Sequence, residues 1–420
     1  MGRTYRSRNK KKRQQIFVHS EETNEYIINL KRWMIQRGWE NISDLVLANF
    51  STTERGLYSK RKIAENDRII SIPLKLMITF GTIASTSYML ELFNPEDGKL
   101  TIHELISIFI VLEHHKNDYS YWKHYFKSLP RRVQIPWICS DDELKLFPSY
   151  LQPYVQYRRF KLENSWQNVL NLTNNNWRCS CCKQDGFTLI TKEIFEWAYV
   201  IVNTRGVYIN PNFYQVPNNW PILSDEPNIA LCPFLDMFNH SDLANTVASV
   251  VNDNYELISL TNYDKYEQIF ISYGCHDNLK LFCEYGFFIP GNKLDNVQLN
   301  IKNLFNLKLI KLDRRQYNYA KEKAFTEDLF VDFSGPSFNF KGLLFISFNT
   351  DYHVWNEVIF NENYSVDDRK KMYEICVLLL EKNLKELTLE MESFENRKSF
   401  VSADIFESVS AFTKCRLDFV

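Results

Sequence analysis

The 420-residue sequence lacks any apolar run long enough to cross a membrane, which takes about 20 consecutive apolar residues. Its N-terminus is basic with no apolar stretch behind it, so no secretory signal peptide is expected. The sequence also lacks a large net charge of either sign, because 50 lysines and arginines stand against 51 acidic residues, a formal net charge of −1. This balance excludes a molecule that is basic over its whole surface, so any contact with nucleic acid would need a local basic region.

The nine cysteines lack the regular spacing of a disulfide framework and fit the reduced thiols of a nuclear or cytosolic protein. Three of them lie together in Cys179-Ser-Cys181-Cys182, and thiolates at short spacing can chelate zinc. A structural zinc site needs four ligands, however, and no second cysteine pair or histidine pair lies at a suitable distance along the sequence. We therefore expect no metal and interpret these three residues as ordinary thiols.

Residues 1–19 are polar and strongly basic, with arginines and lysines gathered between Arg3 and Arg13. Such a segment cannot bury enough apolar area to fold alone, so we predict a disordered tail. It can serve as a nuclear-localisation signal or a nucleic-acid contact, or it can simply be a solvated tail. The sequence favours neither interpretation.

The remaining sequence, 45% hydrophobic and 15% aromatic, is typical of a well-packed globular protein with two or three structural units. A helix is predicted from about Glu21 to Gly38, followed by short strands at 45–50, 56–59 and 68–72. From about residue 80 to 187 the pattern is helical and aromatic. Further strands are predicted at 246–251, 256–260 and 268–273, and helices at 191–202, 307–325 and 372–387.

Two later segments carry the most informative residues. Residues 230–238 form an apolar run that is broken by Pro233 and Asp236, and it ends in Asn239-His240-Ser241, residue types that favour turns. About thirty residues later, a buried strand pattern ends in Ser272-Tyr273-Gly274. Taken singly, the first is a structural turn and Tyr273 is a core tyrosine whose hydroxyl is satisfied. Alternatively, both segments place polar side chains at a cleft.

In combination, Pro233-x-x-Asp236-x-x-Asn239-His240, the strand ending in Tyr273-Gly274, and Glu284-Tyr-Gly-Phe287 resemble the SET-domain protein methyltransferases. The branch they resemble is typified by the Rubisco large-subunit methyltransferase. The resemblance implies an α+β SET fold over residues 20–290, with a helical insertion at about 80–190 and a pseudoknot in which the two segments are threaded. A helical substrate-binding-like domain over 291–420 would follow.

The resemblance also implies S-adenosyl-L-methionine as the cofactor. Arg205 would anchor the carboxylate of the cofactor, while Tyr273, the catalytic residue, would line the channel for the methyl acceptor. Tyr273 also matches a cofactor-binding residue of the family, and the other positions that do so are Glu54, Arg55, Gly56, Leu57, Asp236, Asn239 and His240. Those expected to contact the substrate are Val207, Tyr208, Tyr285 and Phe287.

Two positions depart from the family pattern. Val207 stands where relatives often carry an aromatic residue, or an asparagine in the histidine-methylating member, which argues against a histidine acceptor. Lys265-Tyr266-Glu267 replaces a Gly-Glu pair before the last strand, which puts the local turn in doubt. The chemistry that follows this turn is unaffected.

The expected activity is S-adenosylmethionine-dependent N-methylation of lysine side chains in histone or non-histone proteins. We expect a monomer of the nucleus and cytoplasm that has no membrane partner. One alternative is a peptide-binding adaptor with a SET fold and little turnover. Another is a protein-histidine methyltransferase.

Overall fold

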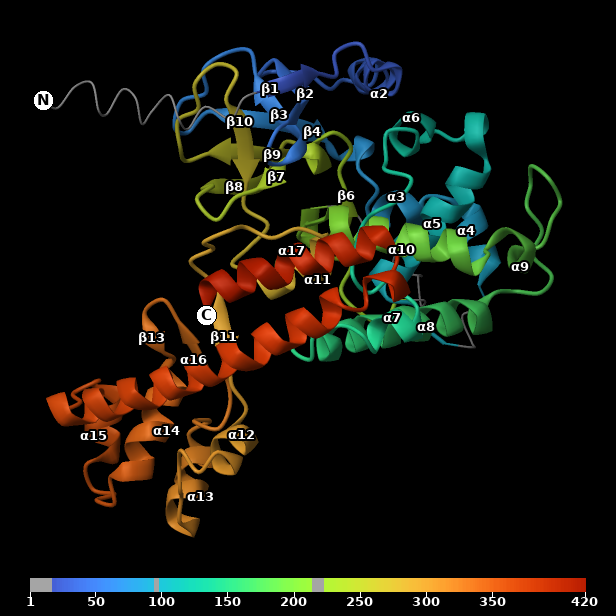
Figure 1. Ribbon diagram of the computed structural model, residues 1–420. Helices are drawn as coiled ribbons and strands as arrows, with labels where there is room; N and C mark the ends of the chain where they lie inside the picture. Colours follow the sequence, from blue (N-terminus) through green and yellow to red (C-terminus); the bar gives the residue numbers. More distant parts are fainter. Residues whose placement is uncertain (1–16, 94–97, 214–222) are drawn as a thin grey trace, which may run out of the picture. The chain divides into compact units, whose positions relative to one another are not determined.

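The computed structural model describes residues 17–93, 98–213 and 223–420 (Figure 1). The chain divides into two compact units, the first formed by residues up to Val133 together with Arg158–Gly274. The second comprises Gln134–Tyr157 and Cys275–Val420, so it begins before the boundary at residue 290 expected from the sequence. The basic residues from Arg3 to Arg13 lie outside the described part. Within that part, no helix has the length and apolar character needed to span a membrane.

The main sheet of the first unit has the strand order β1-β2-β3-β10-β7. Its strands are β1 (Phe17–Ser20), β2 (Leu45–Phe50), β3 (Glu54–Ser59), β10 (Gln268–Ile271) and β7 (Asn239–His240). All neighbours run antiparallel except β7, which pairs in parallel with β10. The sheet therefore brings together the two segments that the sequence analysis singled out.

Strand β1 corrects the expected extent of the basic tail, which was taken to be disordered as far as residue 19. Residues 17–20 pair with β2, and Phe17 lies opposite Phe50 in the register. Phenylalanine and valine at positions 17 and 18 favour extended backbone. The prediction was wrong for these residues because the charged residues before them dominated the composition of the segment.

Two smaller sheets complete the strands of the first unit. One has the order β4-β9-β8, formed by Arg68–Pro73, Asn254–Ser259 and Thr246–Val251. The other joins β5 (Gly206–Tyr208) to β6 (Ile229–Leu231). The strands predicted from apolar patterns at 68–72, 246–251 and 256–260 are thus confirmed with small shifts at their ends.

Helices make up most of the segment between β4 and β5. Helix α5 (Ile102–His115) begins with a capping box between Thr101 and Glu104, and nearly all its side chains are buried. It packs against α10 (Lys192–Arg205), which Thr191 caps and which includes most of the helix predicted at 191–202. Other helices of the first unit are α2 (Glu25–Ile35), α3 (Phe80–Ala84), α4 (Ser87–Leu92), α6 (Lys123–Phe126) and α9 (Gly186–Leu189). The boundary between the units falls inside α8 (Gln152–Leu172).

The second unit is mostly helical. Its helices are α7 (Asp141–Leu144), α11 (Asn278–Tyr285), α12 (Ile301–Asn306), α13 (Arg314–Glu322), α14 (Phe338–Phe348), α15 (Trp355–Phe360), α16 (Val366–Glu395) and α17 (Ala403–Phe419). A small sheet joins β11 (Asn296–Gln298), β12 (Phe330–Asp332) and β13 (Gly335–Pro336), so this part is not entirely helical. The helix expected over 307–325 begins only at Arg314, because Lys308 has left-handed backbone and Asp313 caps α13.

Candidate active site

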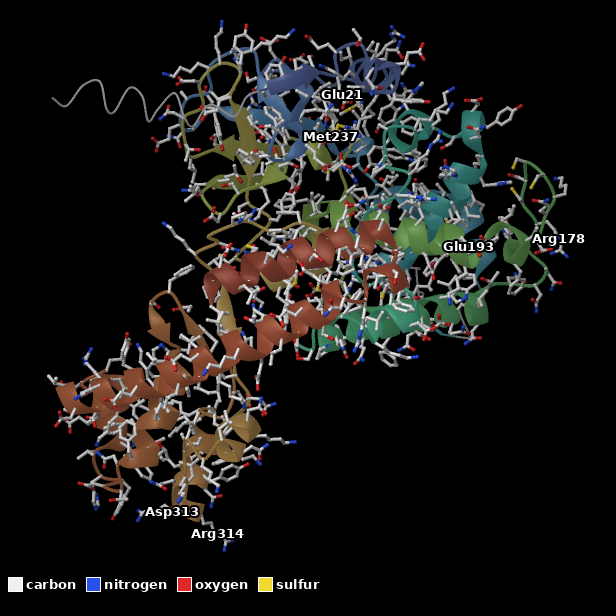
Figure 2. The ribbon with its side chains drawn as sticks, viewed as in Figure 1. Glu21, Arg178, Glu193, Met237, Asp313 and Arg314 are labelled. Atoms are coloured by element: carbon white, nitrogen blue, oxygen red, sulfur yellow. The ribbon has the colours of Figure 1, made fainter. Side chains whose placement is uncertain are left out.

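Three strands that are distant in the sequence lie side by side at the candidate site. In β10, Ile269 pairs with Leu57 of β3 on one side, and Phe270 pairs with Asn239 of β7 on the other. Figure 2 shows Met237, just before β7, in this sheet-containing region of the first unit. The sheet therefore gathers the predicted residues of β3 and β7, and Tyr273 follows directly after β10.

Asn239 connects its own strand to the turn before β3. Both hydrogens of its amide group are used, since Nδ2 donates to the carbonyl oxygens of Thr53 at 3.2 Å and Arg55 at 2.9 Å. Its Oδ1 atom makes no hydrogen bond among the described residues. The amide is thus fixed by two main-chain acceptors and presents one free acceptor of its own.

Close packing against two neighbouring side chains requires glycine at position 56. A Cβ atom at this position would lie 2.3 Å from Nε2 of Gln268 and 2.8 Å from Nδ2 of Asn239. Gln268 is itself buried and accepts a hydrogen bond from the hydroxyl of Thr53 at 2.8 Å. The missing side chain of Gly56 therefore leaves room for the amide groups of two neighbouring strands.

Arg205, the last residue of α10, contacts Asp236 twice. Its Nη1 atom donates to the main-chain oxygen of Asp236 at 3.0 Å and lies 3.3 Å from Oδ2 of the carboxylate. The hydroxyl of Tyr125 donates to the same Oδ2 at 2.9 Å. Within the described chain, Nε and Nη2 of Arg205 make no hydrogen bond, and its side chain is 22% exposed. The guanidinium therefore keeps one edge for another anion.

The carboxylate of Asp236 is fully buried, and this burial shifts its pKa. Desolvation raises the pKa of this carboxyl, although the charge of Arg205 and the bond from Tyr125 act in the opposite direction. Burial raises the pKa of the Tyr125 hydroxyl well above its ordinary value, and the neighbouring carboxylate of Asp236 is the second cause of this rise. Tyr125 thus stays a neutral donor. The sequence analysis did not single out Tyr125, which lies in the segment described there only as helical and aromatic.

Tyr273 is held at two points. Its hydroxyl donates to the main-chain oxygen of Phe238 at 2.6 Å, and its main-chain N–H donates to Nδ1 of His240 at 3.0 Å. The two rings also stack, with centroids 5.2 Å apart. Because Nδ1 accepts this bond, the neutral imidazole carries its proton on Nε2, so the 3.4 Å approach of Nδ1 to the oxygen of Ile271 is only a contact. His240 therefore positions the backbone of Tyr273.

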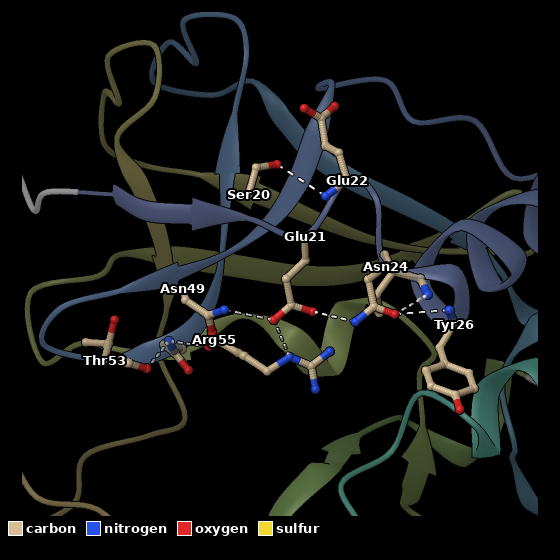
Figure 3. A network of polar contacts seen from close by, with 10 residues as sticks. Ser20, Glu21, Glu22, Asn24, Tyr26, Asn49, Thr53 and Arg55 are labelled. Carbon is tan, nitrogen blue, oxygen red and sulfur yellow. Dashed lines mark hydrogen bonds and ion pairs between the residues drawn. The ribbon is translucent and has the colours of Figure 1, made fainter.

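Arg55 belongs to a polar network around Glu21 that the sequence analysis missed (Figure 3). Nε of Arg55 lies 3.2 Å from Oε1 of Glu21, which also accepts a bond from Asn49 at 3.1 Å. Oε2 of Glu21 accepts from Asn24, the residue that caps α2. Glu21 thus fixes Arg55 to the first helix. No local motif marks it, because its partners lie on other elements.

The remaining residues predicted for the site differ in how exposed they are. Glu54 is exposed and has left-handed backbone, with φ of 55°, whereas Leu57 is fully buried in β3. Val207 is half-buried on β5, next to Tyr208, which is 67% exposed. Tyr285 and Phe287 lie together in the second unit with ring centroids 6.2 Å apart. A cofactor-binding role for Glu54 and Leu57 stays a prediction. A substrate-binding role for the other four residues also stays a prediction.

Comparison with known proteins identifies the class. The model of the SET domain matches residues 54–274, more than half of the chain, and the chain therefore belongs to the SET domain family. This match confirms the family and the fold expected from the sequence. The SET methyltransferases use S-adenosylmethionine, so the predicted cofactor is confirmed at the level of the family.

Individual relatives show how similar this chain is to known proteins. The chain is 28% identical to SET domain-containing protein 4 of Artemia parthenogenetica, over 76% of this chain and 77% of the relative. It is also 25% identical to an actin-histidine N-methyltransferase of Gallus gallus, covering 70% of this chain and 47% of the relative. A solved structure of the SET domain of LSMT bound to lysine and AdoHcy is similar in fold, with a TM-score of 0.58 and 17% identity. The similarity covers 95% of this chain and 90% of that one.

The close packing at Gly56 gives a direct test of the site. We expect Gly56→Ala to displace Asn239 and Gln268, to lower the free energy of unfolding by about 1–3 kcal/mol, and to weaken cofactor binding. Denaturant unfolding and calorimetric titration with S-adenosylmethionine measure the two effects. Adding Gln268→Ala removes the closer clash, so stability should recover in the double variant while binding stays weak. Normal cofactor affinity in Gly56→Ala would contradict this account of the site.

Proposed function

We propose that this chain is a protein-lysine N-methyltransferase that uses S-adenosylmethionine. The observation that carries the proposal is that, among the described residues, one edge of the Arg205 guanidinium and Oδ1 of Asn239 make no hydrogen bond. These two groups complement the carboxylate and ammonium of an amino-acid zwitterion, which is the methionine end of the cofactor. The family membership and the fixed hydroxyl of Tyr273 support the same reading.

In this proposal, Arg205 binds the carboxylate of the cofactor by a charge-assisted pair. Oδ1 of Asn239 accepts from its ammonium group, because Nδ2 is already committed to Thr53 and Arg55. Asp236 holds Arg205 in position from the buried side. The absence of a Cβ at Gly56 leaves Asn239 free to take this orientation.

When bound, the cofactor supplies an electrophilic methyl group on a sulfonium. The acceptor must be a neutral amine, whereas a free lysine has a pKa of about 10.4. A dry channel beside a cation disfavours the ammonium form, so no strong base is required. The hydroxyl of Tyr273 donates to the main-chain oxygen of Phe238 and is thereby fixed in position, where its oxygen would face the amine and the methyl C–H groups. Its contribution is alignment of the reacting groups.

Lysine is favoured over histidine by the residue at position 207. Valine is apolar and offers no hydrogen-bonding group to orient an imidazole. The histidine-methylating alternative draws support from the relative that acts on actin histidine, although that similarity covers only about half of the relative. We propose histone or non-histone lysines as acceptors, and a nuclear and cytoplasmic location for the enzyme.

Replacement of Asn239 tests the proposal. Asn239→Ala should raise the Kd for S-adenosylmethionine by about 10–100-fold, since a hydrogen bond to a charged group contributes about 1.5–3 kcal/mol. Methyl-labelled S-adenosylmethionine incubated with a cell extract should label discrete proteins with the wild type and none with this variant. Asn361→Ala is the matched control, because it removes a similar amide-to-carbonyl bond on an exposed helix end.

Two results would count against the proposal. If Asn239→Ala labelled proteins as well as the wild type, the assigned role of Asn239 would be wrong. If the wild type bound the cofactor but labelled nothing, the adaptor with a SET fold would become the better description.

A further inference from the structure

A cluster of three cysteines and one histidine lies in the first unit, outside the site described above. His115 is the last residue of α5, and Cys179, Cys181 and Cys182 lie in the loop between α8 and α9. One ligand atom from each residue lies within 4.8 Å of the other three. The sequence analysis sought further ligands only as cysteine or histidine pairs and missed His115, a single histidine that lies 66 residues before Cys181 and contacts it.

The distances within the cluster are short. Nε2 of His115 lies 3.2 Å from Sγ of Cys182 and 3.3 Å from Sγ of Cys181, and the sulfurs of Cys179 and Cys181 are 3.1 Å apart. This sulfur separation exceeds the disulfide bond length of about 2.05 Å, and all three cysteines are free thiols. Four ligands around one zinc ion, with Zn–S near 2.3 Å, would be separated by about 3.8 Å. A small outward adjustment would therefore accommodate the ion.

The backbone of the loop already folds the three thiols to one place. The N–H of Lys183 donates to the oxygen of Cys179 at 2.9 Å, and the N–H of Cys179 donates to the oxygen of Gln184 at 2.8 Å. Arg178 and Asp185 form an antiparallel bridge, and Lys183 takes left-handed backbone with φ of 64°. This tight hairpin reduces the ordering that metal binding would require.

The composition of the cluster indicates which metal would bind. Three thiolates and one imidazole form the tetrahedral Cys₃His set that zinc occupies in structural sites. Soft sulfur ligands disfavour magnesium and calcium. A complete set of four protein ligands leaves no open position for water or substrate, so the ion would not be catalytic. Arg178, next to the first ligand, lies at the outer edge of the helical region, far from Met237 at the active site (Figure 2).

We propose that His115, Cys179, Cys181 and Cys182 bind one structural zinc ion. The ion links the end of α5 to the hairpin between α8 and α9, and so closes a long loop of the helical insertion. Cys181 and Cys182 are exposed, so their own side chains contribute little burial to the stability of this hairpin. Metal binding would supply the stabilisation that such a surface segment lacks.

The metal content of the full chain tests this proposal. Protein purified after expression with added zinc should contain about one zinc per chain, measured by plasma mass spectrometry. Cys181→Ser and His115→Ala should each lower zinc retention against a chelator by at least about 10-fold. Cys275→Ser, which removes an exposed cysteine outside the cluster, should retain the full amount.

A second measurement does not depend on how well the variants fold. Cobalt added to the metal-free wild type should give the visible absorption of a tetrahedral thiolate site, and zinc should abolish it. Three results would overturn the proposal. They are a wild type without stoichiometric zinc or cobalt binding, equal zinc content in Cys181→Ser and Cys275→Ser, and a disulfide within residues 179–182 found by mass spectrometry of the freshly purified protein.

Discussion

Replacing Tyr273 with phenylalanine is expected to lower kcat for methyl transfer by at least about 100-fold, the usual effect of removing one preorganised polar group from an active site. The hydroxyl is fixed by its 2.6 Å bond to Phe238, so its acceptor lone pairs have a set direction before the substrate arrives. Phenylalanine keeps the ring that stacks on His240. Affinity for S-adenosylmethionine should therefore change little. Single-turnover kinetics and calorimetric titration separate the two quantities.

Tyr263→Phe provides a matched control for this variant. Tyr263 is buried, whereas Tyr273 is half-buried, and the hydroxyl of Tyr263 likewise donates to a main-chain oxygen, that of Phe270, at 3.1 Å. Each substitution removes one tyrosine-to-carbonyl bond, at about 1 kcal/mol of stability. Only Tyr273→Phe should lose turnover. Equal kcat values for the two variants would remove Tyr273 from the mechanism.

Arg205→Ala is expected to have the second large effect. It leaves the buried carboxylate of Asp236 without its cation, and breaking such a pair lowers stability by about 3 kcal/mol. The same substitution removes the proposed anchor for the carboxylate of the cofactor, so the Kd should rise by about 100-fold, from the loss of a charge-assisted bidentate contact. Denaturant unfolding and cofactor titration measure the two losses independently.

A double variant separates the structural role of Arg205 from its binding role. Asp236→Asn removes the buried charge while its amide oxygen can still accept the bond from Tyr125. In the Arg205→Ala background it should restore most of the lost stability. Cofactor affinity should stay low, because the anion-binding group is still missing. Recovery of normal affinity in the double variant would show that Arg205 acts only by supporting the fold.

The local parts of the site could be predicted from the sequence. The Asn239-His240 segment and the strand ending at Tyr273 each have a recognisable pattern, and their pairing in the main sheet is observed. Strand positions at 45–50 and 68–72 follow from apolar patterns and lie where expected. Short-range patterns succeed at these places because the residues that define them are neighbours in the chain.

Long-range partners could not be predicted in the same way. Tyr125 bonds Asp236 across 111 residues of sequence, and Glu21 reaches Asn49 across 28. His115 joins the cysteine cluster from another helix. The sequence does not show whether the hydroxyl of a buried tyrosine donates its hydrogen bond to a carboxylate or to a carbonyl. Only the fold decides which polar groups meet.

The turn at Tyr266 shows how a departure from the family pattern is accommodated. Relatives usually have glycine before the last strand, and Tyr266 here takes left-handed backbone with φ of 65°. Its N–H donates to the oxygen of Ser59 at 2.9 Å, and its ring packs against Tyr58. The turn keeps the left-handed conformation that suits glycine. These two contacts offset the strain that a bulky residue has in that region.

The most direct test of the proposed activity is the chemical identity of the methylated side chain. Proteins labelled by the wild-type enzyme from methyl-labelled S-adenosylmethionine can be digested and analysed by mass spectrometry, with Tyr273→Phe as the inactive reference. The account predicts methyl groups on lysine Nζ, absent from the reference sample. Methylhistidine as the product, or methyl-lysine at the same level with Tyr273→Phe, would contradict it.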